Sequence, residues 1–160
     1  MDIINPYYED KSKLEKFRKL LLEEKKRILD RVLKQEETIK KLTEEGWTIP
    51  EELDDYARID YTEIILSELE DVEIEILKEI DKALERMKEG TYGLCEVCGN
   101  PIEEKRLEAI PWTTLCITHA QEAEKNIDFI DHRYKDYLLK MGIPKFENLE
   151  EEVKEEGEDK

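Results

Sequence analysis

The sequence predicts an all-α protein in which a long antiparallel coiled-coil hairpin is followed by a small cysteine-containing finger and a C-terminal helix. Three observations lead to this fold class. Two long, charged segments carry apolar residues at intervals of three and four, a spacing that places them on one face of a helix. A short connector separates the segments, so the two helices can fold back on one another. Two pairs of metal-binding residue types follow the second helix.

The composition favours long helices over a thick globular core. Charged residues make up 43% of the 160 residues and apolar residues 39%, which suits helices that bury one stripe each. The formal charge of −17 opposes binding to duplex DNA or to an anionic membrane. No apolar run approaches the roughly 20 residues that span a bilayer, and the N-terminus lacks a signal-peptide core. We therefore expect a cytoplasmic protein whose cysteines do not form disulfides.

The hairpin is expected over residues 12–89, after an N-terminal segment of residues 1–11. Ser12 and Glu15 form a capping-box signature at the start of the first helix. Gly46 follows the last apolar position, so this helix should end near residue 45. Its apolar stripe consists of Leu14, Phe17, Leu21, Ile28, Val32, Ile39 and Leu42.

The second helix is expected to run from about Ala57 to Glu89. Thr48 and Glu51 make another capping-box signature in the connector, with Pro50 in the first turn, where its missing N–H costs little. At ~1.5 Å per residue, about 33 residues predict a rod of roughly 50 Å. The stripe of this helix consists of Ile65, Leu69, Val72, Ile76, Ile80, Ala83 and Met87.

The connector end of the hairpin, residues 46–57, is predicted to form an acidic tip. Taken alone, a cluster of carboxylates at a connector is most often a solvated, well-capped turn. A tip that acts on a partner is the alternative, and the residues by themselves leave both open. The carboxylates concerned are Glu51, Glu52, Asp54, Asp55 and Asp60.

Glycine and proline divide the rest of the chain into three parts. The finger occupies residues 90–119, and a C-terminal helix is expected over residues 120–141, where Gly142 and Pro144 stop it. Residues 142–160 form an acidic tail with little to bury, which we expect to be frayed. The apolar positions of the C-terminal helix are Ala123, Ile127, Ile130, Tyr134, Tyr137, Leu138 and Met141.

The finger contains two pairs of residues that typically bind zinc. Cys95 and Cys98 are separated by two residues, and after seventeen intervening residues Cys116 and His119 repeat the spacing. Each pair directs two side chains at one centre, and zinc takes four sulfur or nitrogen ligands in a tetrahedron. We predict one structural zinc ion, because four protein ligands leave no open position for catalysis. The alternative is that His119 lies on a helix surface and that water or His132 completes the site.

Residues 81–116 read DKALERMKEGTYGLCEVCGNPIEEKRLEAIPWTTLC. This stretch combines a helix end, a GTYGxCExCGxPI knuckle and an RLEA-x-P segment at fixed spacing, and it closely resembles the DksA/TraR zinc-finger family. The likeness extends more loosely over residues 12–140. It implies a transcription factor that docks on bacterial RNA polymerase without contacting DNA. Such proteins insert a coiled-coil hairpin into the secondary channel, toward the active-site magnesium.

The resemblance also implies a use for the acidic tip. In the DksA branch of the family the tip motif is Asp-x-x-Asp-x-Ala. An ungapped alignment back from the knuckle places Glu52, Asp55 and Ala57 on these positions, with one conservative change of carboxylate. A long, narrow acidic rod also suits a deep pore that ends at a catalytic metal. We therefore expect Asp55 and Ala57, with Glu52 in support, to act on the polymerase.

The chain departs from the family pattern in two places. The family's fourth cysteine is His119 here, which resembles the Cys-x-x-His form of some relatives and should still bind zinc. The basic groups of ppGpp-responsive members are matched by Glu79, Ile110 and Ala120. These cannot pair with phosphates, which argues against ppGpp as a ligand. Two basic residues near the finger are expected to serve surface solubility: Lys105 and Arg106.

Two other classes of function stay open at this stage. A DNA-binding zinc-finger regulator would need a basic stripe, whereas Lys and Arg are interleaved with Glu here. A coiled-coil adaptor for another partner would need no particular tip. We do not expect an enzyme, because the sequence shows no nucleophile, phosphate-binding loop or zinc-hydrolase signature. The predicted partner is RNA polymerase, with no DNA or membrane partner.

Overall fold

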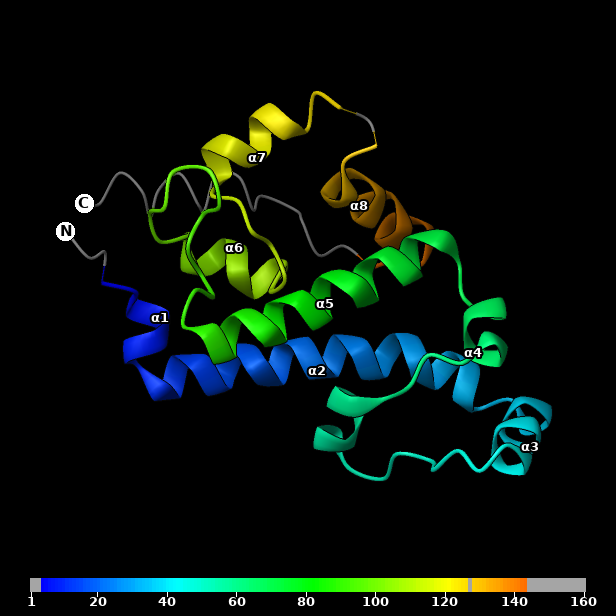
Figure 1. Ribbon diagram of the computed structural model, residues 1–160. Coiled ribbons are helices and arrows are strands. Elements are labelled where there is room, and N and C mark those ends of the chain that lie inside the picture. The colour runs from blue at the N-terminus through cyan, green and yellow to red at the C-terminus, as the bar shows by residue number, and fades with distance from the viewer. Residues whose placement is uncertain (1–3, 127, 144–160) are drawn as a thin grey trace.

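Two long helices lie antiparallel and side by side across the middle of the protein (Figure 1). They are α2, Lys11–Leu33, and α5, Asp71–Glu89. The computed structural model describes residues 4–126 and 128–143, and the regular elements in these residues are all helices. The prediction of an all-α protein built on an antiparallel hairpin is confirmed.

The two helices pair through apolar stripes of the kind that the sequence shows. The buried residues of each helix fall one, three or four positions apart, or at sums of these, so they share one broad face that can cover the partner helix. At 1.5 Å per residue α2 is about 35 Å long, shorter than the roughly 50 Å expected for one continuous helix. The buried apolar side chains are Phe17, Leu21, Leu22, Ile28, Leu29, Val32 and Leu33 from α2, with Ile76, Leu77, Ile80, Ala83 and Met87 from α5.

The first helix uses a different cap from the one predicted. Asp10 is the N-cap, and its carboxylate accepts hydrogen bonds from the N–H groups of Ser12 and Lys13. Aspartate is as strong an N-cap as serine, and here it precedes the helix while Ser12 lies inside it. The capping box of Ser12 and Glu15 was therefore a wrong prediction, although it placed the N-cap to within two residues.

The first helix also ends earlier than predicted. It stops at Leu33, and a separate helix α3, Glu36–Glu44, follows an extended Gln35 with φ −80° and ψ 116°. The break directs α3 toward the short helix α4, Glu63–Ser67, on the returning chain. Leu42 is fully buried at this end of the hairpin. Packing with α4 thus replaces the straight continuation that periodicity suggested.

The second long helix starts fourteen residues later than predicted, at Asp71 rather than Ala57. Its N-cap is Glu70, which exchanges side-chain and backbone hydrogen bonds with Glu73 in a capping box. The predicted capping box of Thr48 and Glu51 begins no helix in the structure. The chain between the long helices instead forms the 3₁₀ helix η1, Leu53–Arg58, and α4.

The acidic segment, which we define as residues 46–60, lies beside α2 and not at the end of the hairpin (Figure 1). The guanidinium of Arg18 contacts the carboxylate of Asp54 at 2.8 Å, and the hydroxyl of Tyr56 donates to Asp30 at 2.5 Å. The predicted position of the acidic tip was therefore wrong. In this structure α3 and α4 form the end of the hairpin.

The C-terminal region contains two helices where one was predicted over residues 120–141. They are α7, Ile117–Ala123, and α8, Ile130–Lys140. Helix α8 packs against α5 and completes the core with Tyr134 and Leu138. The predicted acidic tail lies, from residue 144 onward, outside the described residues.

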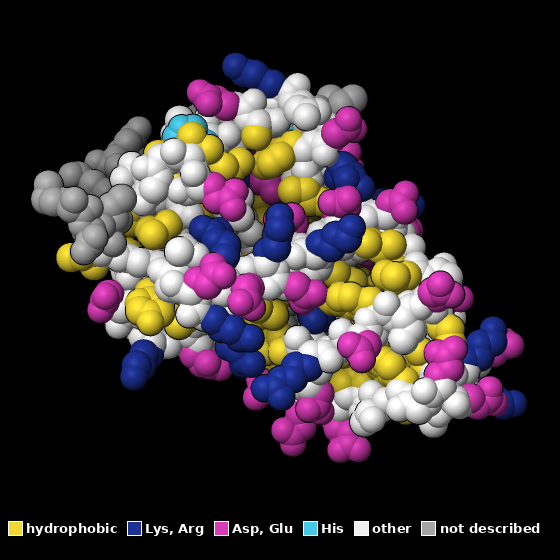
Figure 2. Space-filling model, in the orientation of Figure 1, with side chains coloured by type: hydrophobic (Ala, Val, Ile, Leu, Met, Phe, Trp, Pro, Cys, Tyr) yellow, Lys and Arg dark blue, Asp and Glu magenta, His cyan; other side chains and the backbone are white. Residues whose placement is uncertain are grey.

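The surface mixes charges of both signs. On the face shown in Figure 2, lysine and arginine side chains lie among aspartates and glutamates, with small apolar patches between them. In the described part of the chain, every helix is too short or too polar to cross a membrane.

Candidate metal centre and acidic segment

The first half of the finger is a tight turn that begins after α5. Gly90 caps α5 in the left-handed conformation, with φ 81°. An isolated antiparallel bridge then joins Leu94 to Pro101, and the N–H of Cys95 donates to the carbonyl of Asn100 at 2.9 Å. Gly99, with φ 73°, closes the turn in a conformation that glycine adopts without strain. The turn brings the side chains of its two cysteines to one side.

The second half of the finger returns to this turn through the start of α7. The N–H of Glu96 donates to the carbonyl of Thr114 at 2.8 Å, which joins the two halves. Cys116 is the N-cap residue of α7, and His119 lies in the first turn of that helix. Residues three apart share a helix face, so Cys116 and His119 both face the first pair.

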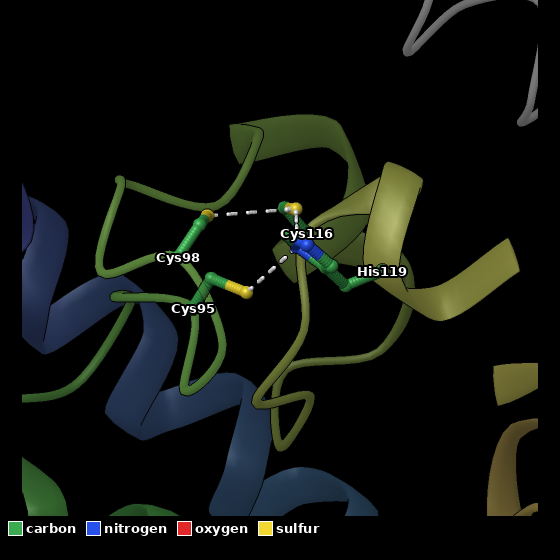
Figure 3. A group of neighbouring side chains, drawn as sticks. All are labelled: Cys95, Cys98, Cys116 and His119. Carbon is green, nitrogen blue, oxygen red and sulfur yellow. Dashed lines mark hydrogen bonds between the residues drawn. The ribbon is translucent and has the colours of Figure 1, made fainter. Parts of the chain in front are cut away.

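The four predicted zinc-binding side chains converge on one centre (Figure 3). Nδ1 of His119 lies 3.2 Å from Sγ of Cys116 and 3.6 Å from Sγ of Cys95, and the sulfurs of Cys98 and Cys116 are 3.9 Å apart. A zinc tetrahedron with bonds of about 2.0–2.3 Å has edges of roughly 3.5–3.8 Å. All four ligand atoms lie within 4.8 Å of one another. The donor set and its spacing fit zinc.

The fourth member of the cluster is His119. His132, the alternative that the sequence left open, lies in α8 and is not part of the group of metal-binding side chains among the described residues. The imidazole of His119 presents Nδ1 to the sulfurs. Three soft thiols and one imidazole form a closed donor set of the structural kind.

The thiols of Cys95 and Cys116 have opposite pKa shifts. Burial raises the pKa of Cys95, but the N–H groups of Cys116, Cys98 and Val97 outweigh this effect and lower the pKa to about 6. Burial and the neighbouring thiol of Cys95 raise the pKa of Cys116 to about 11. Two adjacent thiolates repel each other, and a divalent cation between them favours both. The site therefore suits a metal ion that supplies positive charge.

An N-terminal helix supports the base of the finger, and sequence reasoning missed it. Helix α1, Pro6–Glu9, is capped by Asn5, whose side-chain amide also donates to the carbonyls of Gly90 and Tyr92 at 3.0 and 2.7 Å. Tyr7 packs against Gly93 and donates from its hydroxyl to the finger. The pair Asn5-Pro6 is a helix-start signal, so the helix could have been found from the sequence, although its contacts could not.

Arg106 is not a surface residue, which corrects the prediction made for it. It lies on α6, Glu104–Ala109, is 2% exposed, and forms a 2.5 Å ion pair with the equally buried Asp131 of α8. It also donates to the carbonyl of Leu115 and the hydroxyl of Thr113. Arg106 thus connects the finger to the C-terminal helix.

The three predicted tip residues lie together on η1. Glu52 is its N-cap and Asp55 its third residue, and each side chain accepts a hydrogen bond from the other's backbone N–H. Asp55 also accepts from the N–H of Glu51, and these two backbone N–H groups lower the pKa of Asp55. Ala57 follows on the same turn and is half-buried. Asp55 and Ala57 both line a cavity of about 810 Å³ between the acidic segment and Arg18.

Comparison with known proteins identifies the family. Residues 90–125 match the prokaryotic dksA/traR C4-type zinc finger. The RNA polymerase-binding transcription factor DksA of Escherichia coli (strain K12) is 30% identical over 123 residues, which cover 75% of this chain and 79% of that protein. The chain belongs to the DksA/TraR family.

Two further comparisons extend over most of the chain. An uncharacterised protein of Aquifex aeolicus (strain VF5) is 42% identical over 151 residues, or 93% of this chain and 99% of that protein. The structure of transcription factor DksA2 from Pseudomonas aeruginosa is 32% identical in sequence, covers 76% of this chain and 91% of its own, and has a TM-score of 0.48.

Membership of the DksA/TraR family and the side-chain cluster agree on the cofactor. The family's finger is of the C4 type, and this chain offers three cysteines and a histidine at one centre. The cofactor is a structural zinc ion. Its chemistry there is to hold the two halves of the finger together.

Proposed function

We propose that this DksA/TraR protein is a cytoplasmic transcription factor that binds RNA polymerase and modulates transcription initiation. One observation carries the proposal: the likeness to a protein named as an RNA polymerase-binding transcription factor spans 123 residues, well beyond the finger. A shared finger alone would leave the function open, since one module can serve many functions. No catalytic role is proposed for the zinc ion, because its donor set is closed.

The proposed roles of the residues rest on the metal cluster and on the family resemblance. Cys95, Cys98, Cys116 and His119 bind the zinc ion and fix the finger on the base of the hairpin. The hairpin enters the secondary channel of the polymerase. Glu52, Asp55 and Ala57 then act near its inner end, where a carboxylate can interact with a catalytic metal or with the loops around it.

The proposal excludes direct DNA binding as the route to the promoter. The protein has 43 acidic and 26 basic side chains, and on the face shown in Figure 2 the basic ones are interspersed with acidic ones. DNA-binding proteins present a basic patch or stripe to the phosphates. A DNA-binding regulator is therefore the weaker alternative.

The structure supports the view that ppGpp is not a ligand at the positions used by responsive relatives. Ile110 and Ala120 are at most 1% exposed, so neither presents a polar group there. Glu79 carries a negative charge and pairs with Lys82. Phosphates pair most strongly with cationic side chains, which these three positions do not supply.

The first test separates binding from action. Asp55→Asn keeps an oxygen that can accept the N–H bonds of η1 but removes the charge, and Ala57→Leu adds bulk on the same turn. We expect both variants to fold and to be pulled down with RNA polymerase, but to lose most of the effect on transcription initiation in vitro. The matched control is Glu85→Gln, which neutralises an exposed carboxylate on α5 and should change little.

Two results would count against the proposal. If polymerase is not recovered in a pull-down from lysate while another protein is, the adaptor function replaces it. If polymerase is recovered but both variants regulate as well as the parent protein, the acidic segment has no role in the effect and the hairpin serves only for docking.

A further inference from the structure

The acidic segment contacts the shaft of the hairpin, by which we mean the paired helices α2 and α5. The contact lies well before the hairpin's end. Arg18, which contacts Asp54, lies about four helical turns before Leu33, the last residue of α2. At 1.5 Å per residue this is roughly 22 Å along the helix. A residue that must reach the bottom of a narrow channel gains nothing from a position so far back along the shaft.

We propose that the structure is a closed conformation, in which contacts of Arg18 and Asp30 with the acidic segment hold Glu52, Asp55 and Ala57 against the shaft, and that release of this segment precedes action on the polymerase. The inference rests on the proposed function, which it deepens by assigning a means of regulation to the same residues. The closed state limits how often the segment is available to the partner.

One buried side chain anchors the segment. Tyr56 is 5% exposed against α2, and its hydroxyl donates to the carboxylate of Asp30 at 2.5 Å. Lys26 binds the same carboxylate at 2.5 Å and lies 5.7 Å from the centre of the Tyr56 ring. Burial raises the pKa of Asp30, but the hydrogen bonds from Lys26 and Tyr56 outweigh it and lower the pKa. Asp30 is therefore charged at neutral pH, and its carboxylate accepts the hydrogen bond that holds Tyr56.

A second, exposed contact orients the acidic face. The guanidinium of Arg18 pairs with Asp54 at 2.8 Å, where the side chains are 34% and 76% exposed. Exposed ion pairs contribute little to stability, so this contact is easily exchanged for another. A cationic surface on a partner could compete with Arg18 for Asp54.

The rest of the segment is suited to leave the shaft as a unit. Apart from Tyr56 its residues are exposed or half-buried, and many of them line the cavity of about 810 Å³, to which α2 contributes Arg18. A hydrogen bond joins the two ends of the segment: the indole N–H of Trp47 donates to the carbonyl of Asp60 at 3.3 Å. Gly46 comes directly before Trp47, with φ 85° and no atom within 4 Å of the position that a Cβ would take. Segments with few buried contacts open at low free-energy cost.

The first experiment needs no polymerase. Hydroxyl-radical footprinting of the zinc-bound protein measures the exposure of Tyr56, with the buried Tyr92 of the finger as internal reference. We expect Arg18→Glu, which places two negative charges together, to raise oxidation of Tyr56 at least about threefold, and Arg18→Glu with Asp54→Arg to restore the parent value. Asp30→Asn should raise it as well. Lys19→Glu makes the same charge change one position away and should not.

The second experiment adds RNA polymerase. Variants that expose Tyr56 should modulate initiation at lower protein concentration than the parent. Unchanged oxidation of Tyr56 in both Arg18→Glu and Asp30→Asn overturns the closed conformation, whatever the polymerase does. If the parent protein is active and the variants show increased oxidation of Tyr56 but modulate initiation at no lower concentration, the regulatory role of the closed conformation is overturned. If no form affects transcription while Tyr56 responds as expected, the proposed function fails and the closed conformation remains.

Discussion

Gly93 shows how closely the N-terminal helix approaches the finger. It has φ 87°, and a Cβ at this position would lie 2.2 Å from Cδ2 of the buried Tyr7. A side chain here would meet both a backbone conformation that favours glycine and a ring that is held by its own hydrogen bond. The contact explains why a glycine stands in this place.

We predict that Gly93→Ala destabilises the zinc-bound protein by about 3 kcal/mol, from backbone strain and overpacking together. Denaturant unfolding followed by circular dichroism measures the change. Gly142→Ala is the matched control, because Gly142 also has a positive φ, 75°, but no atom within 4 Å of the added Cβ. It should show the backbone cost alone, and equal losses in the two variants would rule out the steric explanation.

His119 is the residue at which this chain departs from a four-cysteine finger. We predict that His119→Cys still binds one zinc ion, since four thiolates also form a tetrahedral site, and that His119→Ala binds it more weakly because one ligand is lost. Competition with a chromogenic chelator measures both affinities. An affinity unchanged in His119→Ala would show that another group, such as water or His132, completes the site.

The fold of the finger depends on contacts between segments that are distant in the sequence. Its two halves are joined near the cysteines by a few hydrogen bonds, among them that from Glu96 to Thr114. Beyond the metal centre, Arg106 ties it to α8 through Asp131, and Asn5 ties its base to α1. Loss of one partner of a buried ion pair is strongly destabilising, so separation of Arg106 from Asp131 should weaken the packing of α8.

We predict that removal of zinc by a chelator unfolds residues 90–120, loosens α8, and leaves most of the helicity of α2 and α5. Hydrogen exchange with mass spectrometry measures the loss of protection by element, and circular dichroism measures the helicity that remains. The hairpin persists because α2 and α5 bury their apolar stripes against each other. A metal-free protein that keeps its protection over residues 90–120 would contradict a structural role for the metal.

At the scale of the whole molecule, charge and shape favour a protein partner. The formal charge is −17, and the face shown in Figure 2 carries small apolar patches between charges. A field of this sign raises the free energy of any approach to nucleic acid phosphates.

We therefore predict that duplex DNA binds no more tightly than non-specifically at physiological salt. A gel shift with promoter fragments and a scrambled duplex measures this. The zinc-bound protein is the form to use, since loss of the finger would itself change the surface. Nanomolar binding that depends on sequence would instead favour a DNA-binding regulator.

Much of the fold and of the metal centre could be predicted from local patterns. Apolar residues three and four apart specify which faces of α2 and α5 are buried, because that spacing is a property of the helix itself. The pairs of Cys95 with Cys98 and of Cys116 with His119 indicate a zinc site for a similar reason, since each pair lies within one turn. The knuckle also carries the family resemblance, which the comparisons confirm.

Tertiary contacts decided what these patterns leave open. The first helix stops at Leu33 without a glycine or proline, because α3 packs on α4. Arg106 is buried because Asp131, twenty-five residues away, neutralises it. The acidic segment lies beside the shaft because Tyr56 donates a hydrogen bond to Asp30 of α2. Each of these outcomes depends on a partner distant in the sequence, and such pairings are determined only when the whole chain is packed.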